Sequence, residues 1–268
     1  MVLKKIWSKP PGMWQDFWIE ELERRNDPRI AHYVELELKI IKEINELGYN
    51  FYWYGEFSGS TFTKKDNAVV HILIKYLTKI GNDYAPKINY INSLGVKGFY
   101  EATEFLIKEY KDSIPPHYNS WNLNFIAQNI SEIEDPRYID IYLEFLQDDK
   151  LTTEASYIVE MLGKMKVEKA IPYFIKLLNL ENLIDSKFYG KSVEDNKYFV
   201  SQTAIKALSM FKNPDHIKYI EKFLEPEKLS WIKFSDAAIK DYKHIYKTTY
   251  TEYRKIAEKA IKKMRGDK

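Results

Sequence analysis

Hydrophobic residues recur at helical spacing in two runs between Tyr157 and Leu178, and these runs predict a helical hairpin. A polar corner from Gly163 to Lys169 separates the two runs, and Pro172 stands early in the second one. Proline is tolerated in the first turn of a helix, so the second run is predicted to begin shortly before it. This hairpin is the template with which the rest of the chain is compared.

Two further segments repeat the template without gaps, at offsets of 32 and 46 residues. The matching apolar sets are Ile130, Leu162 and Leu208; Ile133, Met165 and Phe211; Ile139, Ile171 and Ile217; and Leu146, Leu178 and Leu224. The 14 additional residues of the longer offset fall in a charged segment, 181–196, which is predicted to project as a loop. A fixed period of helix pairs is the sequence pattern of a helical solenoid.

The corners of these helix pairs share a chemical pattern. Asp27, Asp135 and Asn213 each stand before a proline, which places a capping side chain before a first-turn residue with a suitable φ. The N-terminal hairpin is therefore predicted to belong to the same array. Gly48 is expected to stop its second helix, and Asp66 to cap the helix that follows.

The composition supports a helical chain without cysteine chemistry. Only 10 glycines and 10 prolines interrupt 268 residues, and there is no cysteine, so disulfides, thiolate metal sites and cysteine nucleophiles are excluded. No apolar run reaches the length of a signal peptide core or of a membrane-spanning helix. We therefore expect a cytoplasmic protein without a membrane partner.

The template resembles the HEAT-repeat superfamily, in particular the short repeats first recognised in bilin lyases. The resemblance lies in Leu162-Gly163, in Lys169-Ala170-Ile171-Pro172 and in Leu177-Leu178, and Ser131 and Ser209 replace the glycine in the other copies. It implies an all-α fold, a right-handed α-α superhelix of about six helical hairpins. We expect one such domain over residues 13–265, after an N-terminal extension of residues 1–12.

The segment 49–65, which follows the second predicted helix, has no helical period and is predicted to be a loop or a short hairpin. It is rich in aromatic residues and is the first candidate site. Exposed tyrosine and tryptophan supply binding energy at low entropic cost, so the loop could hold a peptide or a base. An equally weighted alternative is that the loop folds back and fills the space between repeats. Glu56 is the first candidate for a hydrogen bond to a ligand. The candidate contacts are Tyr52, Trp53, Tyr54, Glu56 and Phe57.

The second candidate site is the concave face, which second helices line in HEAT-like arrays. Charged positions beside the core stripe run from acidic to basic, namely Asp140, Glu144, Lys176, Lys218 and Lys222. An ordinary solvated face would carry similar charges, and this alternative is favoured by two to one. With Asp148 and Asp149, the acidic end would repel a nucleic acid backbone.

Catalytic signals are weak. The five histidines are dispersed, and none forms an i, i+4 pair of the kind that binds zinc on a helix. Asp241 and His244 could act as orienter and base, but this spacing on a helix more often makes an ion pair. No glycine-rich phosphate loop is present. The sequence predicts no catalytic residue, no metal and no cofactor.

These patterns favour a non-catalytic protein-binding scaffold or adaptor that uses its concave face and inserted loops. An immunity-type inhibitor would be one protein of this class. The alternative is a DNA-binding protein resembling the HEAT-like alkylation-repair glycosylases, for which Trp53, Trp121 and Trp231 would be available. The 41 basic and 39 acidic residues give a formal charge of +2, which disfavours nucleic acid. A protein or peptide is the expected partner.

Overall fold

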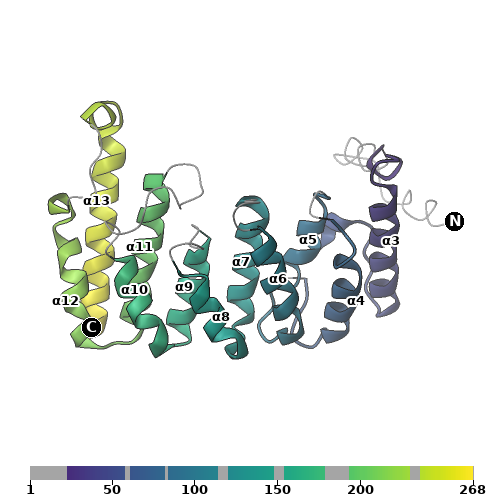
Figure 1. Ribbon diagram of the computed structural model, residues 1–268, viewed down its shortest axis with the longest axis horizontal. Coiled ribbons are helices and arrows are strands. Elements are labelled where there is room, and N and C mark those ends of the chain that lie inside the picture. The colour runs from purple at the N-terminus through teal and green to yellow at the C-terminus, as the bar shows by residue number, and fades with distance from the viewer. Residues whose placement is uncertain are drawn as a thin grey trace. The chain divides into compact units, whose positions relative to one another are not determined.

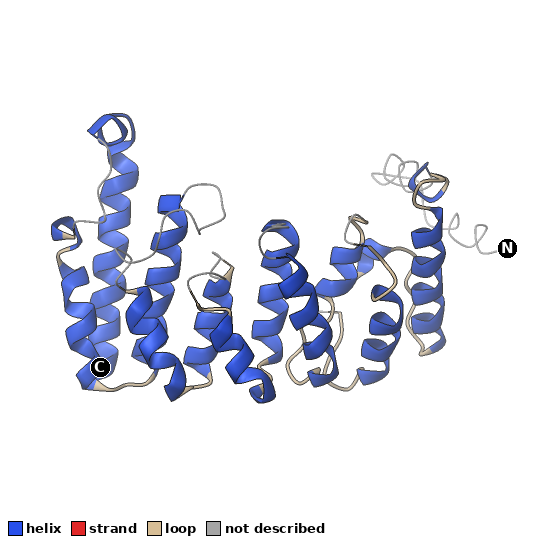
Figure 2. Cartoon of the chain, viewed as in Figure 1, coloured by secondary structure: helices blue, strands red, loops and turns tan. Residues whose placement is uncertain are grey.

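The computed structural model describes residues 23–57, 61–81, 84–113, 120–147, 154–178, 193–229 and 236–267. All secondary structure in these ranges is helical, which confirms the predicted all-α class (Figure 2). Within them, no helix combines the length and apolar character that crossing a bilayer requires. The predicted first helix up to Leu22 and most of the 181–196 segment lie outside the described residues.

The chain divides into two compact units, Met1–Glu109 and Tyr110–Lys268. The division falls within one helix, α6, and each unit is described by itself. The prediction of a single domain over 13–265, with a right-handed superhelix of about six hairpins, stays a prediction.

The first unit is built around α4, which packs on α3, on α5 and on η2. Its elements are α3 (Ala31–Glu46), the 3-10 turn η1 (Tyr54–Glu56), α4 (Asn67–Leu77), α5 (Lys87–Asn92), η2 (Tyr100–Ala102) and the first part of α6 (Thr103–Ser113). The buried side chains of α3 recur at helical spacing, from Val34 through Ile40 to Ile44, and face its neighbours. Gly48 follows α3 with φ of 100°, which confirms it as the residue that ends the helix.

In the second unit the longer helices stack in chain order (Figure 1): α9 packs on α7 and on α11, and α11 packs on α13. The elements are α7 (Ser120–Ile133), η3 (Pro136–Tyr138), α8 (Ile139–Glu144), α9 (Ala155–Lys164), η4 (Glu168–Ala170), α10 (Ile171–Leu177), α11 (Val193–Met210), η7 (Pro214–His216), α12 (Ile217–Ile220), η8 (Glu221–Leu224), η9 (Pro226–Lys228) and α13 (Asp236–Arg265). Each of the first three long helices is therefore followed by a 3-10 turn and a short helix.

The predicted register of the three copies is confirmed in this unit. The short helices begin at Ile139, Ile171 and Ile217, which are equivalent positions of the alignment. The residues with positive φ are also equivalent: Glu134, Lys166 and Lys212, at 53° to 54°. Ile130, Leu162 and Leu208 are fully buried. The repeat therefore extends from the apolar pattern to the backbone conformation of each corner.

The capping role of the residue before proline is confirmed at the corners of the second unit. The side chain of Asp135 accepts a hydrogen bond from the backbone N–H of Arg137 at 3.0 Å, and Asn213 does the same for Asp215. The bonds of Asp135 and Asn213 each satisfy a backbone donor that the start of a helical segment leaves without an internal partner.

In the first unit, Asp27 accepts from the N–H of Arg29 at 2.9 Å, but this bond lies in a turn over residues 27–30. Because α3 begins at Ala31 without a side-chain cap, the predicted capping of this helix by Asp27 is corrected.

The predicted corner at Gly163 needs a correction. Gly163 lies inside α9, and the left-handed residue that turns the chain is Lys166. The N–H of Lys166 donates to the carbonyl of Gly163, and the N–H of Val167 to the carbonyl of Leu162, at 3.1 and 3.0 Å. These two bonds form a Schellman motif, which satisfies the last carbonyls of the helix. The apolar pattern could not separate helix end from turn, because a lysine at positive φ has no sequence signal.

Candidate functional site

The loop between α3 and α4 is held against the end of α3 by hydrogen bonds from one side chain of the helix to the loop backbone. The side-chain amide of Asn45 donates from Nδ2 to the carbonyl of Phe51 and accepts from its N–H, both at 2.8 Å. This pair of bonds turns the chain back along the last turn of the helix. Sequence reasoning missed Asn45. The available signal was its position, four residues before Tyr49, where the loop begins.

Glu56 organises the loop from within. Its Oε2 accepts hydrogen bonds from the N–H of Tyr52 at 2.5 Å and of Trp53 at 3.2 Å, and so caps the 3-10 turn η1. The sequence analysis had proposed this carboxylate as a hydrogen-bond partner for a ligand. In the structure this oxygen serves the loop's own backbone, because the start of the turn leaves these donors without internal partners.

Phe57 belongs to the core of the first unit and is only 2% exposed. Its ring lies 4.6 Å from the ring of Phe51 and 4.7 Å from that of Tyr90, measured between centroids. The prediction that Phe57 contacts a partner is therefore corrected, because its side chain is buried among aromatic rings that anchor the loop. This part of the loop follows the alternative interpretation, in which it fills space beside the helices.

The remaining candidates of the loop, Tyr52, Trp53 and Tyr54, are partly exposed. A Cβ on Gly55 would lie 1.9 Å from Cη2 of Trp53, so the indole ring lies directly against the glycine. The Arg24 guanidinium lies 4.8 Å from the centroid of the Tyr54 ring. The rings of Trp53 and Tyr54 therefore pack against neighbouring groups of the same unit.

A buried charged cluster lies beside this loop and was missed by the sequence analysis. Glu37 of α3 is fully buried, and its Oε1 accepts from Nη2 of Arg24 at 2.8 Å. The hydroxyl of Tyr84 donates to Oε2 of Glu37 at 2.5 Å, and Arg24 also contacts this hydroxyl. Burial and the Glu37 carboxylate raise the pKa of Tyr84 well above its ordinary value. Arg25 donates to the carbonyl of Tyr52 at 3.0 Å. The cluster joins residues 24 and 25 to α3 and to the loop.

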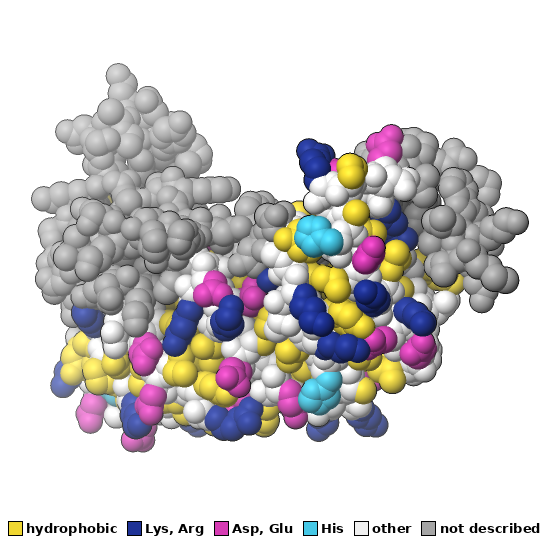
Figure 3. Space-filling model, turned by 45° about the vertical axis from the view of Figure 1, so that its right-hand side comes forward, with side chains coloured by type: hydrophobic (Ala, Val, Ile, Leu, Met, Phe, Trp, Pro, Cys, Tyr) yellow, Lys and Arg dark blue, Asp and Glu magenta, His cyan; other side chains and the backbone are white. Residues whose placement is uncertain are grey.

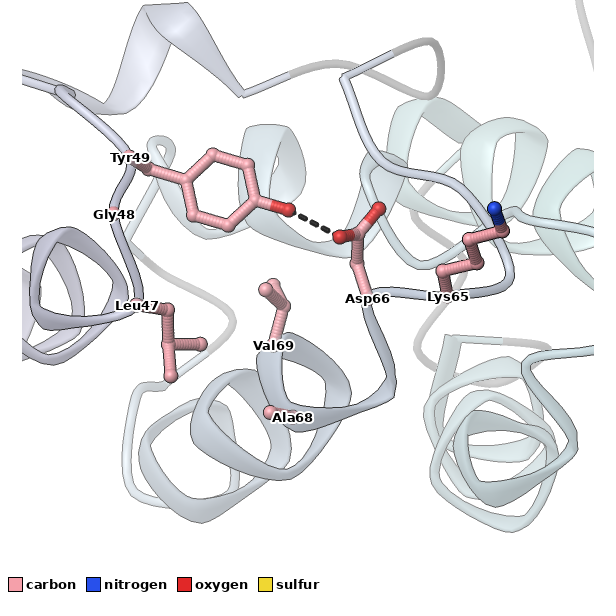
Figure 4. A pocket seen from close by; sticks show the side chains of 7 residues that line it. All are labelled: Leu47, Gly48, Tyr49, Lys65, Asp66, Ala68 and Val69. Carbon is pink, nitrogen blue, oxygen red and sulfur yellow. Dashed lines mark hydrogen bonds between the residues drawn. The ribbon is translucent and has the colours of Figure 1, made fainter.

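A pocket of about 280 Å³ opens where α3 ends and α4 begins (Figure 4). It is lined by Leu47, Gly48, Tyr49, Lys65, Asp66, Ala68 and Val69. Val69 is fully buried, whereas Leu47 is 47% exposed, the largest exposed fraction of any large hydrophobic residue that the structure describes. The pocket thus has a lining of mixed polar and apolar residues, with the apolar side chain of Leu47 in solvent.

The polar wall of the pocket is a hydrogen-bonded pair. The hydroxyl of Tyr49 donates to Oδ1 of Asp66 at 2.5 Å (Figure 4), and Oδ2 accepts from the N–H and the hydroxyl of Thr63 at 2.7 and 2.9 Å. Burial and the Asp66 carboxylate raise the pKa of Tyr49 to about 12. The hydrogen bonds from Tyr49 and Thr63 lower the pKa of Asp66. Asp66 precedes α4 as predicted, but its carboxylate does not cap the helix because these donors hold it.

Two lysines, Lys64 and Lys65, stand directly before Asp66 in the sequence, and one of them lines the pocket. Lys65 lines the pocket, Lys64 precedes it, and both side chains are exposed. Neither forms an ion pair with any carboxylate in the described part of the chain. Sequence reasoning missed both lysines because the aromatic residues before them dominated the pattern.

The charged positions predicted on the inner face belong to the second unit and have local partners. Asp140 pairs with Lys169 at 3.1 Å, and Nζ of Lys222 donates to the carbonyl of Leu178 at 2.9 Å. Lys218 lies over the ring of Tyr219 at 5.1 Å. Of the other two inner-face candidates, Glu144 is partly exposed and Lys176 is exposed. The structure thus joins Asp140 to the following copy, and the predicted role of this face in binding stays a prediction.

Candidate catalytic groups do not assemble in the part of the chain that the structure describes. No group of three or more histidine or acidic side chains placed to hold a metal ion occurs there. His117, Trp231, Asp148 and Asp149 lie outside the described residues, as do the side chains of Trp121, Asp241 and His244.

Comparisons with family models, with curated proteins and with solved structures find no match to this chain, so its resemblance to the HEAT-repeat superfamily stays a prediction.

Proposed function

We propose that the protein is a non-catalytic protein-binding scaffold or adaptor, and that the pocket at the end of α3 receives a side chain of its partner. The pocket itself carries this proposal. Its volume is about 280 Å³. This space suits one large side chain with part of its backbone, and it is at the lower limit for a cofactor or drug-sized ligand.

The exposure of Leu47 supports a macromolecular partner. A large apolar side chain at a pocket edge gains about 25 cal/mol for each Å² that a partner removes from water. Leu47 is 47% exposed, and Val69 at the base of the pocket is already buried. A partner side chain that covers Leu47 would therefore remove apolar surface from water, whereas Val69 has no exposed surface left to bury.

Hydrogen bonds hold the chain on both sides of the pocket. Asn45 fixes the backbone of Phe51 on one side, and Asp66 accepts three hydrogen bonds on the other. A surface that is already ordered loses less side-chain and loop entropy on association. This preorganisation supports the use of the pocket as a contact site.

The charge distribution favours a protein over a nucleic acid. The formal charge is +2, from 41 basic and 39 acidic residues. On the face drawn in Figure 3, acidic side chains are interspersed with basic ones over the described residues. Nucleic acid binding relies on several cationic side chains along a phosphate backbone, and mixed charges weaken it.

The same proposal includes the architecture of the second unit, which we infer to be a HEAT-like solenoid. Its support is the recurrence of the same corner in three copies, from the left-handed residue to the first residue of the short helix. Exposed charges of the short helices, among them Asp140, Lys176 and Lys218, are proposed as a second contact surface.

The test uses a variant that fills the pocket from its exposed side. Ala68 lines the pocket and is exposed, so Ala68→Leu occupies the space without changing the buried core. Ala31→Leu is the matched control, because Ala31 is also an exposed alanine in the first turn of a helix of the same unit. We expect proteins captured by the wild-type full chain to be retained by Ala31→Leu and lost with Ala68→Leu.

Equal capture by all three forms would contradict a role for the pocket. Retention of duplex DNA at low salt, unaffected by either substitution, would favour the nucleic acid alternative instead. Circular dichroism and thermal unfolding of each variant establish that a loss of capture does not come from a loss of folding.

A further inference from the structure

We propose that the last turns of α13 form a further contact surface, which binds an acidic segment of a partner protein. The inference goes beyond the pocket and rests on the proposed function only for the class of partner. Its basis is an excess of positive charge that is compensated neither within the helix nor by the elements packed against it.

Positive charge is concentrated over the last turns of α13. Residues 250–268 contain seven basic and three acidic residues, a formal charge of +4, whereas the whole chain carries only +2. α13 packs on α11 and on the elements from η7 to η9 (Figure 1). These neighbours lie within residues 193–229, which contain six basic and six acidic residues. The excess therefore belongs to α13, and the elements beside it do not offset it.

Three of the cations form a row on the solvent side of the helix. Lys255, Lys259 and Lys262 are exposed, and their spacings of four and three residues place them one above the other on one side of α13. Tyr253 and Met264, on the other side, are buried in the unit. The row therefore faces outward, where a partner can reach it.

The row has no carboxylate partner within the chain. None of its three lysines forms an ion pair or a hydrogen bond with any residue that the structure describes, and the neighbouring Glu258 pairs with none of them. Arg254, one residue before the row, does pair with Glu227 of η9. Like charges three or four positions apart on a helix repel each other. Carboxylates of a partner would replace this repulsion with attraction.

Stabilisation of the helix end does not account for the whole row. Cations in the last turn of a helix are favourable because they lie near its unpaired carbonyl groups, and Lys262, Lys263 and Arg265 occupy that turn. The effect falls off within one turn. Lys255 and Lys259 stand ten and six residues before Arg265, so their charges serve no such purpose.

A protein segment fits this surface better than a nucleic acid or a membrane. The positive surface is one side of one helix, so a phosphate backbone that extended beyond α13 would meet neighbours with as many acidic as basic residues. A helix that inserts into a membrane surface needs an exposed apolar side, and the apolar side of these turns is already buried. A short acidic segment meets neither obstacle.

The test measures the binding of the full chain to a fluorescent dodecapeptide of alternating glutamate and alanine, by anisotropy at low salt. We expect the affinity to fall by at least about tenfold with Lys255→Glu, Lys259→Glu and Lys262→Glu together, because like charges then face each other. Replacement of the same three lysines by glutamine should give a smaller loss. Binding should weaken as salt is raised, and a peptide with glutamine in place of glutamate should not bind.

The control reverses three exposed lysines that are dispersed along the chain, with Lys39→Glu, Lys79→Glu and Lys111→Glu. It changes the net charge by the same amount and should leave the affinity nearly unchanged. Circular dichroism establishes that each variant is folded.

Equal losses in the two triple glutamate variants would overturn the inference, as would the absence of binding by the wild type. So would tighter binding, through the same three lysines, of duplex DNA or of vesicles of phosphatidylserine and phosphatidylcholine than of the peptide. The pocket is tested separately by protein capture with Ala68→Leu, which should not affect the peptide, so either proposal can fail without the other.

Discussion

Gly163 of α9 lies so close to Ala207 of α11 that a Cβ on the glycine would be 2.8 Å from both the Cα and the Cβ of Ala207. Real Cβ atoms do not approach other heavy atoms to this distance. The neighbour includes backbone, so it cannot move away as the end of a long side chain could. The glycine therefore allows two successive long helices of the second unit to pack closely.

Gly163→Ala is expected to lower the free energy of unfolding by about 1–3 kcal/mol, because the added methyl overpacks the contact between α9 and α11. In a helix free of such a contact, the same change would stabilise by up to ~1 kcal/mol. Urea unfolding followed by circular dichroism measures the difference. Ser131→Ala, at the equivalent position of the preceding copy, is the control and should change stability little. A more stable Gly163→Ala protein would contradict the close packing.

Lys166→Gly should stabilise the protein by roughly 0.5–1 kcal/mol. Lys166 has φ of 54°, a conformation that costs a non-glycine residue about 1–2 kcal/mol and a glycine almost nothing. The greater freedom of glycine in the unfolded chain offsets part of this gain. Thermal and urea unfolding test the change. Lys206→Gly, on an exposed helical position of α11, should instead destabilise by a similar amount.

Tyr142→Phe is expected to leave stability unchanged or to raise it by about 1 kcal/mol. Tyr142 is fully buried, and its hydroxyl has no hydrogen-bond partner, so the fold carries the desolvation cost of that group. The equivalent positions of the other two copies are the apolar residues Phe174 and Ile220. The measurement is the free energy of unfolding in urea.

Tyr253→Phe provides the contrast, because the hydroxyl of Tyr253 is hydrogen-bonded to that of Ser201 between α13 and α11. Its removal should cost about 0.5–1.5 kcal/mol, since the hydrogen bond between these two buried hydroxyls is lost. Equal effects of the two substitutions would show that the hydroxyl of Tyr142 has a partner of similar strength.

Lys87 and Glu109 form a buried ion pair in the first unit, with Nζ 2.9 Å from Oε2. Lys87→Met or Glu109→Leu alone should destabilise by about 3–5 kcal/mol, because each leaves the other charge buried without its partner. The double substitution should recover most of this loss, since it removes both charges together. Urea unfolding of the four proteins forms the required cycle, and additive losses would show that the pair is not coupled.

The bond between Tyr49 and Asp66 predicts a pH dependence. The pKa of Tyr49 is raised to about 12 in the folded state, so its contribution to stability is complete below about pH 10 and is lost as the pH rises toward 12. The pKa of Asp66 is lowered, so its contribution is complete above about pH 4 and is lost at lower pH. The stability difference between wild type and Tyr49→Phe should therefore be largest between about pH 5 and 9.

Urea unfolding of both proteins at pH 7 and near pH 11 tests this dependence. Other groups that titrate in this range do so in both proteins, so their effects cancel in the difference. A difference that stays constant from neutral to alkaline pH would mean that Tyr49 does not keep its proton through the bond to Asp66.

The helical class, the register of the copies and the chemistry of the corners could be predicted from the sequence alone. Ile139, Ile171 and Ile217 each begin a short helix, and Asp135 and Asn213 cap as expected. These features depend on interactions between residues a few positions apart, such as a helical stripe or a side chain bonded to the backbone two residues on. Local interactions of this kind leave a direct trace in the order of the residues.

The candidate site depended on contacts that the order of residues does not reveal. The sequence pointed to Tyr52, Trp53, Tyr54, Glu56 and Phe57, and the structure buries Phe57 and uses Glu56 within the loop. The pocket forms because the end of α3, Tyr49 and the first turn of α4 converge in space. Burial and the pairing of charges result from packing between distant segments, so only the tertiary structure could decide which side chains remain available for a partner.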